Sequence, residues 1–341
     1  MSRITAVRSV VGLGTSMRPV VGHGTGQVVI RIKASGMNRP DLLQDLGLYP
    51  VRKGTTDIMG LEVAGIVQDA NGNDTDREVC ALLPGGGYSE YCVAREEHCL
   101  PIPFDKNDPA RFIKAAGLPE TVFTVWKNLF WNGPDTLKEK RVFIHGGTSG
   151  IGTTAIEMAR AFGASSITCT VGSEAKARFC KDVLGVDYVF DYTSEEWWEK
   201  AQGTDVILDM VGGDYLQKNI SLLRSDGRLV IIGFLGSPIS EKVNMTRVLL
   251  KGLTITGSVL RSSSDESKAK LCSEIHQHVW PRIDDTSIKL PYINNLLPLS
   301  EYKKGFELMA GPWCMGKIIL CPDSLYEEQQ VAFDSMRAQV R

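Results

Sequence analysis

A glycine-rich turn is the segment of this sequence best suited to binding a ligand. It reads Val142-Phe-Ile-His-Gly-Gly-Thr-Ser-Gly-Ile-Gly152, in which an apolar stretch leads into glycines and a helical pattern follows. Backbone amides and the dipole at a helix N-terminus bind pyrophosphate, and glycines let the phosphates approach the backbone. The segment therefore predicts a dinucleotide-binding turn between a strand and a helix.

The residues after the next predicted strand indicate which dinucleotide is bound. That strand ends Cys169-Thr-Val-Gly-Ser173, and its tip carries no carboxylate. Sites that prefer NAD place an Asp or Glu there to bind the ribose 2′-hydroxyl. Ser173 can instead donate a hydrogen bond, and Lys176 can meet a phosphate as a point charge. The pair favours NADPH, although Lys176 alone would also suit an exposed helix.

The elements around the turn alternate between strands and helices, which predicts a parallel sheet with helices on both faces. We expect strands at 141–145, 166–171, 188–190, 206–210, 228–233 and 253–259, and helices at 153–162, 175–184 and 215–223. Before about residue 110, short strands at 27–33, 62–68 and 90–93 are broken by Gly and Pro, which is typical of an antiparallel, barrel-like domain. After about residue 262 we expect helices at 268–280 and 302–309, a strand at 316–320 and a polar tail.

The composition is that of a globular protein, and the length suggests two or three domains. Of 341 residues, 43% are hydrophobic and 23% charged, and the net charge of −2 argues against a nucleic-acid binder. Eight cysteines without a CxxC pair, and no apolar run of membrane-spanning length, lead us to expect a cytoplasmic protein with reduced thiols and no membrane partner. The first 40 residues lack Asp and Glu, as transit peptides do, but Gln27–Lys33 alternates like a strand, and we prefer that interpretation.

Several motifs together resemble the medium-chain dehydrogenase/reductase superfamily over residues 27–320. Within it the resemblance is to the quinone oxidoreductase branch, and most closely to the p53-inducible NADPH quinone oxidoreductase type. A short-chain dehydrogenase is excluded, because no YxxxK follows the turn. The motifs are Gly36-Met-Asn-Arg-Pro-Asp-Leu42, Gly60-Leu-Glu-Val-Ala-Gly65, Ala81-Leu-Leu-Pro-Gly-Gly-Gly87, Pro119-Glu-Thr121, the turn itself, Leu208-Asp-Met-Val-Gly-Gly213, Asp226-Gly-Arg228, Ser258-Val-Leu-Arg-Ser262 and Gly316-Lys-Ile318.

The resemblance implies an α/β fold in which a GroES-like β-barrel domain accompanies a doubly wound, parallel-sheet (Rossmann) domain. Residues 1–115 would form the GroES-like catalytic domain, 116–260 the NADPH-binding domain, and 261–341 the return to the first domain plus a tail. Tyr49 and Asn38 would be the catalytic residues. The implied cofactor-binding residues are Asn38, Thr124, Gly150, Ile151, Gly152, Ser173, Lys176, Tyr192, Gly233, Phe234, Ser258, Leu260 and Lys317.

The resemblance also implies that no metal is bound. Asn38 and Leu61 stand where the alcohol dehydrogenase branch has a Cys and a His zinc ligand. We interpret His98 and His145 as ordinary histidines, either at the surface or supporting other side chains.

Without zinc, direct hydride transfer from NADPH to an already electrophilic acceptor is the chemistry that fits best. We expect a quinone or an activated alkene as substrate, with Tyr49 either donating a hydrogen bond to a quinone oxygen or only lining the pocket. Two enzymatic alternatives are a 2-alkenal/enone reductase and an enoyl-thioester reductase. A third is an NADPH-binding structural or RNA-binding protein with little turnover. We also expect a homodimer, with Leu253–Val259 as the strand that pairs between subunits.

Overall fold

The chain folds into two compact units. The computed structural model describes residues 6–11, 14–19, 24–51, 54–201 and 203–340. The first unit comprises the chain up to Phe123 together with Arg261–Thr286 and the part from Leu290 onward, and the second comprises Thr124–Leu260 with Ser287–Lys289. Helix α3 (Pro119–Leu129) begins in the first unit and ends in the second, and the domain bounds expected from the sequence stay a prediction.

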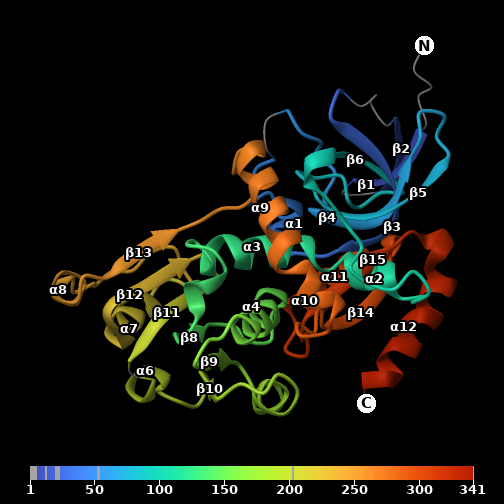
Figure 1. The fold of residues 1–341 in the computed structure, drawn as a ribbon. Helices are drawn as coiled ribbons and strands as arrows, with labels where there is room; N and C mark the ends of the chain where they lie inside the picture. The colour runs from blue at the N-terminus through green and yellow to red at the C-terminus, as the bar shows by residue number, and fades with distance from the viewer. Residues whose placement is uncertain (1–5, 12–13, 20–23, 52–53, 202, 341) are drawn as a thin grey trace. The chain divides into compact units, whose positions relative to one another are not determined.

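The second unit is built on six parallel strands, which confirms the predicted parallel sheet (Figure 1). Its strands are β8 (Arg141–Ile144), β9 (Ser166–Val171), β10 (Tyr188–Asp191), β11 (Thr204–Asp209), β12 (Leu223–Ile231) and β13 (Thr254–Gly257). Their order is β10-β9-β8-β11-β12-β13, the 3-2-1-4-5-6 order of a Rossmann sheet. The helices between them are α4 (Gly150–Ala161), α5 (Glu174–Arg178) with a π-helical continuation (Phe179–Val183), α6 (Trp197–Lys200), α7 (Tyr215–Leu222) and α8 (Thr246–Leu250).

The first unit contains a seven-stranded sheet, ordered β14-β15-β3-β4-β5-β7 with β6 paired to β3. Its strands are β3 (Gln27–Gly36), β4 (Glu62–Gln68), β5 (Asp74–Leu82), β6 (Tyr91–Arg95), β7 (Cys99–Pro101), β14 (Ile293–Pro298) and β15 (Lys317–Cys321), and a separate hairpin joins β1 (Ala6–Val11) to β2 (Gly14–Pro19). The pairs are antiparallel as predicted, apart from β14 with β15, which are parallel and joined through α11 (Tyr302–Ala310).

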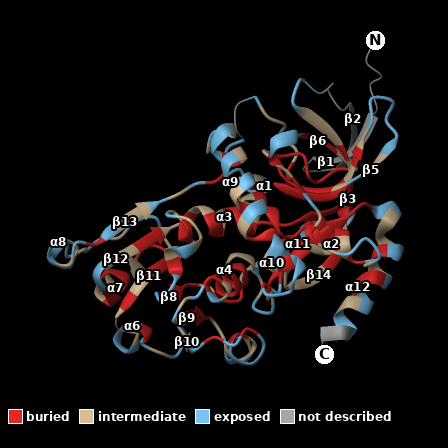
Figure 2. Cartoon of the chain, in the orientation of Figure 1, coloured by how far each residue is buried: buried red, intermediate tan, exposed pale blue. Residues whose placement is uncertain are grey.

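The remaining helices of the first unit are α1 (Arg39–Asp45), α2 (Arg111–Ala115), α9 (Asp265–His278), α10 (Trp280–Asp284) and α12 (Tyr326–Val340). Figure 2 shows that burial follows the strands of each sheet. Ile30 and Val63 lie in the apolar core of the first unit, and Phe143 and Ile207 lie in that of the second. Each unit therefore has a hydrophobic core of its own, which fixes its strand ends and the loops they carry. In the described part of the chain, no helix has both the length and the apolarity needed to cross a membrane.

Candidate active site

The glycine-rich turn joins β8 to α4, as predicted. Ser149 is the N-cap of α4, and its hydroxyl accepts the N–H of Gly152 at 2.9 Å. The amides of Gly150 and Ile151 lie in the first turn, where no carbonyl of the same helix can accept them. A Cβ on Gly152 would collide with the carbonyl oxygen of Gly146, so the turn and the helix are packed as tightly as a dinucleotide turn requires.

Apart from Thr124, which lies in α3, the other predicted cofactor residues of the second unit follow the C-terminal ends of its strands. Ser173 and Lys176 come after β9, Tyr192 after β10, Gly233 and Phe234 after β12, and Ser258 after β13. Ligands of doubly wound sheets bind at this edge, beside the point where the strand order reverses. Here that point lies between β8 and β11, next to the glycine-rich turn.

The structure brings Ser173, Lys176 and Tyr192 together at the tip of β9. Ser173 is the N-cap of α5, and its hydroxyl accepts the N–H of Lys176 at 3.3 Å. Tyr192 donates its N–H to the carbonyl of Val171 at 3.0 Å, and its hydroxyl lies so close to Gly172 that a Cβ there would collide with it. Tyr192 is 50% exposed. These residues form a polar surface next to the strand tip that lacks a carboxylate.

Ser258 presents a polar atom that the described structure leaves without a partner. Its N–H donates to the carbonyl of Ile231 at 3.1 Å, while its buried hydroxyl has no hydrogen-bond partner among the described residues. Leu260 is buried, and the ring of Phe234 is exposed and lies against Gly212. Thr124 is partly buried, and its carbonyl accepts the Asn128 amide at 2.8 Å. An unpartnered buried hydroxyl at a ligand-binding edge fits a bound dinucleotide.

In the first unit, Asn38, Glu62 and Lys317 form a cluster that we call the buried ion cluster. The Lys317 ammonium donates to Glu62 Oε1 and Asn38 Oδ1, both at 2.6 Å, and to the Met37 carbonyl at 2.9 Å. The Asn38 amide donates to Glu62 Oε1 at 2.8 Å. Lys317 is 4% exposed and Glu62 0%. All three ammonium N–H groups of Lys317 are thus used within this unit, and its role toward the cofactor stays a prediction.

Two further carboxyl groups adjoin the buried ion cluster. Asp41 accepts the N–H groups of Asn38 and Gly60 at 2.9 and 3.0 Å and the Tyr88 hydroxyl at 3.2 Å, and burial raises its pKa to about 6. The N–H of Glu120 donates to Glu62 Oε2 at 2.8 Å. Burial and the nearby Glu62 carboxylate raise the pKa of Glu120 to about 8, so Glu120 is mostly protonated at neutral pH.

Tyr49, the predicted hydrogen-bond donor, lies in the first unit in the loop after α1. It is half-buried, and its ring lies over the Arg261 guanidinium, with 5.2 Å between Arg261 Cζ and the ring centroid. Burial raises the pKa of Tyr49, so the phenol is protonated and able to donate at neutral pH. Asn38 immediately precedes α1, so this short helix positions both residues predicted to be catalytic.

Neither histidine is a surface residue, which corrects part of the interpretation from the sequence. His145 is fully buried between Thr170 Oγ1 at 3.0 Å and Asn219 Oδ1 at 2.8 Å, and burial lowers its pKa. His98 is 4% exposed and pairs with the Asp265 carbonyl at 3.1 Å. Among the described residues no three His, Cys, Asp or Glu side chains are grouped so that they could hold a metal ion. Whether the protein binds a metal remains a prediction.

Two charged residues beside Asn38 and Tyr49, namely Glu62 and Arg261, were not predicted from the sequence. Glu62 and Arg261 both stand inside motifs that carried the family resemblance, yet neither was singled out. For Glu62 the available signal was a charged side chain between the apolar residues Leu61 and Val63, since a charged group is rarely buried without a partner or a function. Arg261, followed by Ser262, offered no such signal.

Comparisons with known proteins agree with this architecture. A family model for the alcohol dehydrogenase GroES-like domain matches residues 24–104, and one for zinc-binding dehydrogenase matches 150–275. Mouse quinone oxidoreductase is 27% identical over 311 residues, which cover 86% of this chain and 88% of that protein. A phenolphthiocerol/phthiocerol polyketide synthase of Mycobacterium tuberculosis is 27% identical over 304 residues, 86% of this chain but 13% of the synthase.

Solved structures are similar over nearly the whole chain. The quinone oxidoreductase of Thermus thermophilus, a protein also crystallised with NADPH, has a TM-score of 0.76 at 24% identity, covering 93% of this chain and 99% of its own. The CurK enoyl reductase has a TM-score of 0.75 at 23% identity, covering 93% and 98%. The chain belongs to the medium-chain dehydrogenase/reductase superfamily of oxidoreductases, as its motifs and both domains indicate.

Proposed function

We propose that this protein reduces quinones with NADPH and without catalytic zinc. The observation that carries the proposal concerns positions 38 and 61 of the first unit, where the resemblance places the Cys and His zinc ligands of alcohol dehydrogenases. Leu61 cannot bind a metal, and the Asn38 side chain is already held by Glu62 and Lys317. Without a Lewis acid to polarise an alcohol or aldehyde, the acceptor must already be electrophilic, as quinones and activated alkenes are. The quinone oxidoreductases among the similar proteins support the same acceptor class.

The second unit supplies the cofactor site in this proposal. Gly150, Ile151 and Gly152 hold the pyrophosphate, and Ser173, Lys176 and Tyr192 hold the 2′-phosphate. When bound, NADPH supplies a hydride. The residues that would line its nicotinamide end are Thr124, Gly233, Phe234, Ser258 and Leu260, and the buried ion cluster orients Asn38.

The first unit supplies a hydrogen-bond donor, the Tyr49 phenol, for the negative charge that forms on the acceptor. As the acceptor gains a hydride, one of its oxygens becomes negatively charged, and a proton from solvent later completes the hydroquinone. The Tyr49 phenol, protonated at neutral pH, donates a hydrogen bond to that oxygen and stabilises the charge as it forms.

Replacing Tyr49 with phenylalanine should lower kcat/KM for 1,2-naphthoquinone by roughly three- to thirty-fold, about 0.7–2 kcal/mol, the scale of one hydrogen bond. The affinity for NADPH should hardly change, because the ring and its packing remain. Steady-state kinetics and a fluorescence titration with NADPH measure the two quantities. If Tyr49→Phe stays fully active while Tyr49→Ala loses activity, Tyr49 is only a wall of the pocket. Full activity in both variants would place it outside the site.

An enoyl-thioester reductase is the second candidate, because an enoyl reductase and a polyketide synthase are among the similar proteins. Steady-state rates with 1,2-quinones, enones and enoyl-CoA separate the two enzymes. Negligible turnover with all three acceptor classes, together with tight NADPH binding, would favour a binding protein.

We expect a homodimer that pairs through β13, which lies at the edge of the second unit's sheet. Leu249, Leu250 and Val259 expose 82%, 76% and 53% of their surface beside this strand, and an open edge invites pairing. Light scattering at micromolar concentration should give twice the chain mass. Thr254→Lys, a charge on the edge strand, should produce monomers, whereas Ser225→Lys on the interior strand β12 should not. A monomeric wild type would contradict the expectation.

A further inference from the structure

Arg261 is a buried cation whose hydrogen bonds are only partly satisfied. It is 8% exposed, and its Nη2 donates to Gln44 Oε1 at 2.9 Å and to the Pro84 carbonyl at 3.2 Å. Its Nε and Nη1 are buried and have no acceptor among the described residues. The guanidinium is thus fixed at one nitrogen and holds two others ready to donate.

The surroundings of Arg261 do not supply a counter-charge. No carboxylate of the described residues forms an ion pair with it. Two titratable residues contact Arg261. Its guanidinium faces the ring of Tyr49, and the ammonium of Lys268, which is 4% exposed, donates to the Arg261 carbonyl at 3.1 Å. Glu120 interacts with both Tyr49 and Lys268 but is mostly protonated at neutral pH. Arg261 itself is therefore a buried cation that no carboxylate of the described residues pairs with.

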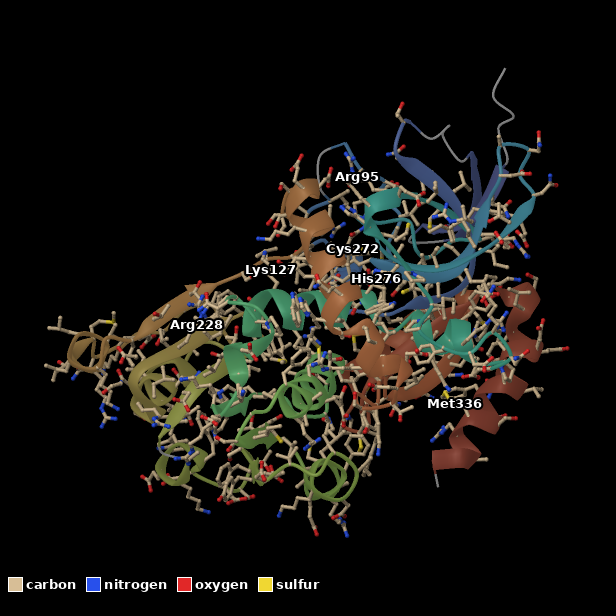
Figure 3. The ribbon with its side chains drawn as sticks, in the orientation of Figure 1. Arg95, Lys127, Arg228, Cys272, His276 and Met336 are labelled. Carbon is tan, nitrogen blue, oxygen red and sulfur yellow. The ribbon has the colours of Figure 1, made fainter. Side chains whose placement is uncertain are left out.

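The segment that carries Arg261 is held firmly by its neighbours. Lys268 lies on α9, and the same helix begins at Asp265, which pairs with Arg95 of β6 at 2.8 Å. Figure 3 labels Arg95. A neutral amide side chain in place of Arg261 could donate to Gln44 and to the Pro84 carbonyl equally well, because both acceptors are uncharged. A buried guanidinium without a counter-ion makes the same two hydrogen bonds but lowers the stability of the fold, because its charge is desolvated. Such destabilising groups are typical of functional sites.

We propose that Arg261 binds an anionic oxygen, that of the acceptor as it is reduced, and acts there together with the Tyr49 hydroxyl. This inference rests on the proposed function and names the group that bears the charge. The acceptor takes up a hydride and its two electrons, and the negative charge that forms on its oxygen is met by the unpartnered N–H groups. Arg261 transfers no proton, since the proton comes from solvent. The phosphate oxygens of the cofactor are also anionic hydrogen-bond acceptors, and the experiment below distinguishes binding of Arg261 to the cofactor from binding to the acceptor.

The test compares Arg261→Met and Arg261→Lys with a matched control, Arg228→Met. Arg228, on β12 in the second unit (Figure 3), also stacks on a ring, that of Trp131 at 4.2 Å, and also has an unpartnered Nε, but it is partly exposed. With 1,2-naphthoquinone, Arg261→Met should lower kcat roughly 100- to 1,000-fold, the usual effect of losing a donor to an oxyanion. Arg261→Lys, which keeps the charge, should lose less, and Arg228→Met should stay near wild type. The dissociation constant of NADPH should stay within about threefold throughout.

A second measurement needs no turnover. 4-Nitrocatechol resembles a reduced ortho-quinone, and its phenolate is visible by absorption. Bound to the wild type it should ionise about one to three pH units lower than when bound to Arg261→Met. Equal ionisation in the two proteins would overturn the proposal, and Arg261→Lys provides the comparison if the Met variant does not fold. Weakened NADPH binding with unchanged kcat would assign Arg261 to the cofactor instead. A wild type that reduces no quinone would refute the proposed function, while the catechol titration still decides what Arg261 binds.

Discussion

Replacing Lys317 with methionine should lower the free energy of unfolding by about 3–5 kcal/mol, because it leaves the Glu62 carboxylate buried without its counter-ion. The two groups are 2.6 Å apart and almost completely buried. Denaturant titration followed by fluorescence measures the loss. The double variant Lys317→Met/Glu62→Gln should recover much of it, because it removes both charges.

An exposed pair in the same unit provides the control. Lys304 and Glu301 lie 2.8 Å apart, but their side chains are 58% and 44% exposed. Lys304→Met should cost less than about 1 kcal/mol, since solvent screens a surface pair. If Lys317→Met were no more destabilising than Lys304→Met, the buried ion cluster would not hold Asn38 in place. Its assignment as the support of Asn38 would then be wrong.

The parts of the fold that local patterns specify were predictable. The six strands of the parallel sheet appear as short apolar runs separated by helical periodicity, and each was expected close to where it lies. β14 was missed because Ile293-Asn-Asn-Leu-Leu-Pro298 does not alternate, and its partner β15 lies beyond an intervening helix. A local pattern cannot reveal such a strand, since it is defined by its pairing.

Residues of the candidate site could be predicted from the sequence only where they belong to a local motif. The glycine-rich turn and the strand tip at Ser173 can be recognised from spacing, because they follow two successive strands, β8 and β9, of one βαβ unit. Glu62 and Lys317 are 255 residues apart, and no spacing rule pairs them. The same is true of Arg261 with Gln44 of α1 and Pro84 of the loop after β5, which come from separate parts of the first unit. Buried polar contacts of this kind depend on tertiary packing.

Lys176→Ala should raise KM for NADPH roughly ten- to a hundred-fold and leave KM for NADH nearly unchanged. One hydrogen bond to a charged group contributes about 1.5–3 kcal/mol, and only NADPH offers the 2′-phosphate. Lys176 lies beside the N-cap Ser173, and Tyr192 packs against Gly172 at the same strand tip. The nearest acid along the chain, Glu174, pairs instead with Arg178 at 3.7 Å. The tip of β9 thus offers a cation rather than a carboxylate to the ribose.

Lys181→Ala is the matched control for this prediction, because Lys181 is an exposed lysine of the π-helical segment that continues α5. It should change neither KM. Raising the salt concentration should weaken NADPH binding to the wild type more than to Lys176→Ala, because salt screens a charge–phosphate contact that is partly exposed to solvent. Fluorescence titrations of both nucleotides measure these affinities directly and show whether the KM values report binding. A wild type that uses NADH as well as NADPH would contradict the assignment, and Ser173 and Tyr192 would then have no phosphate to hold.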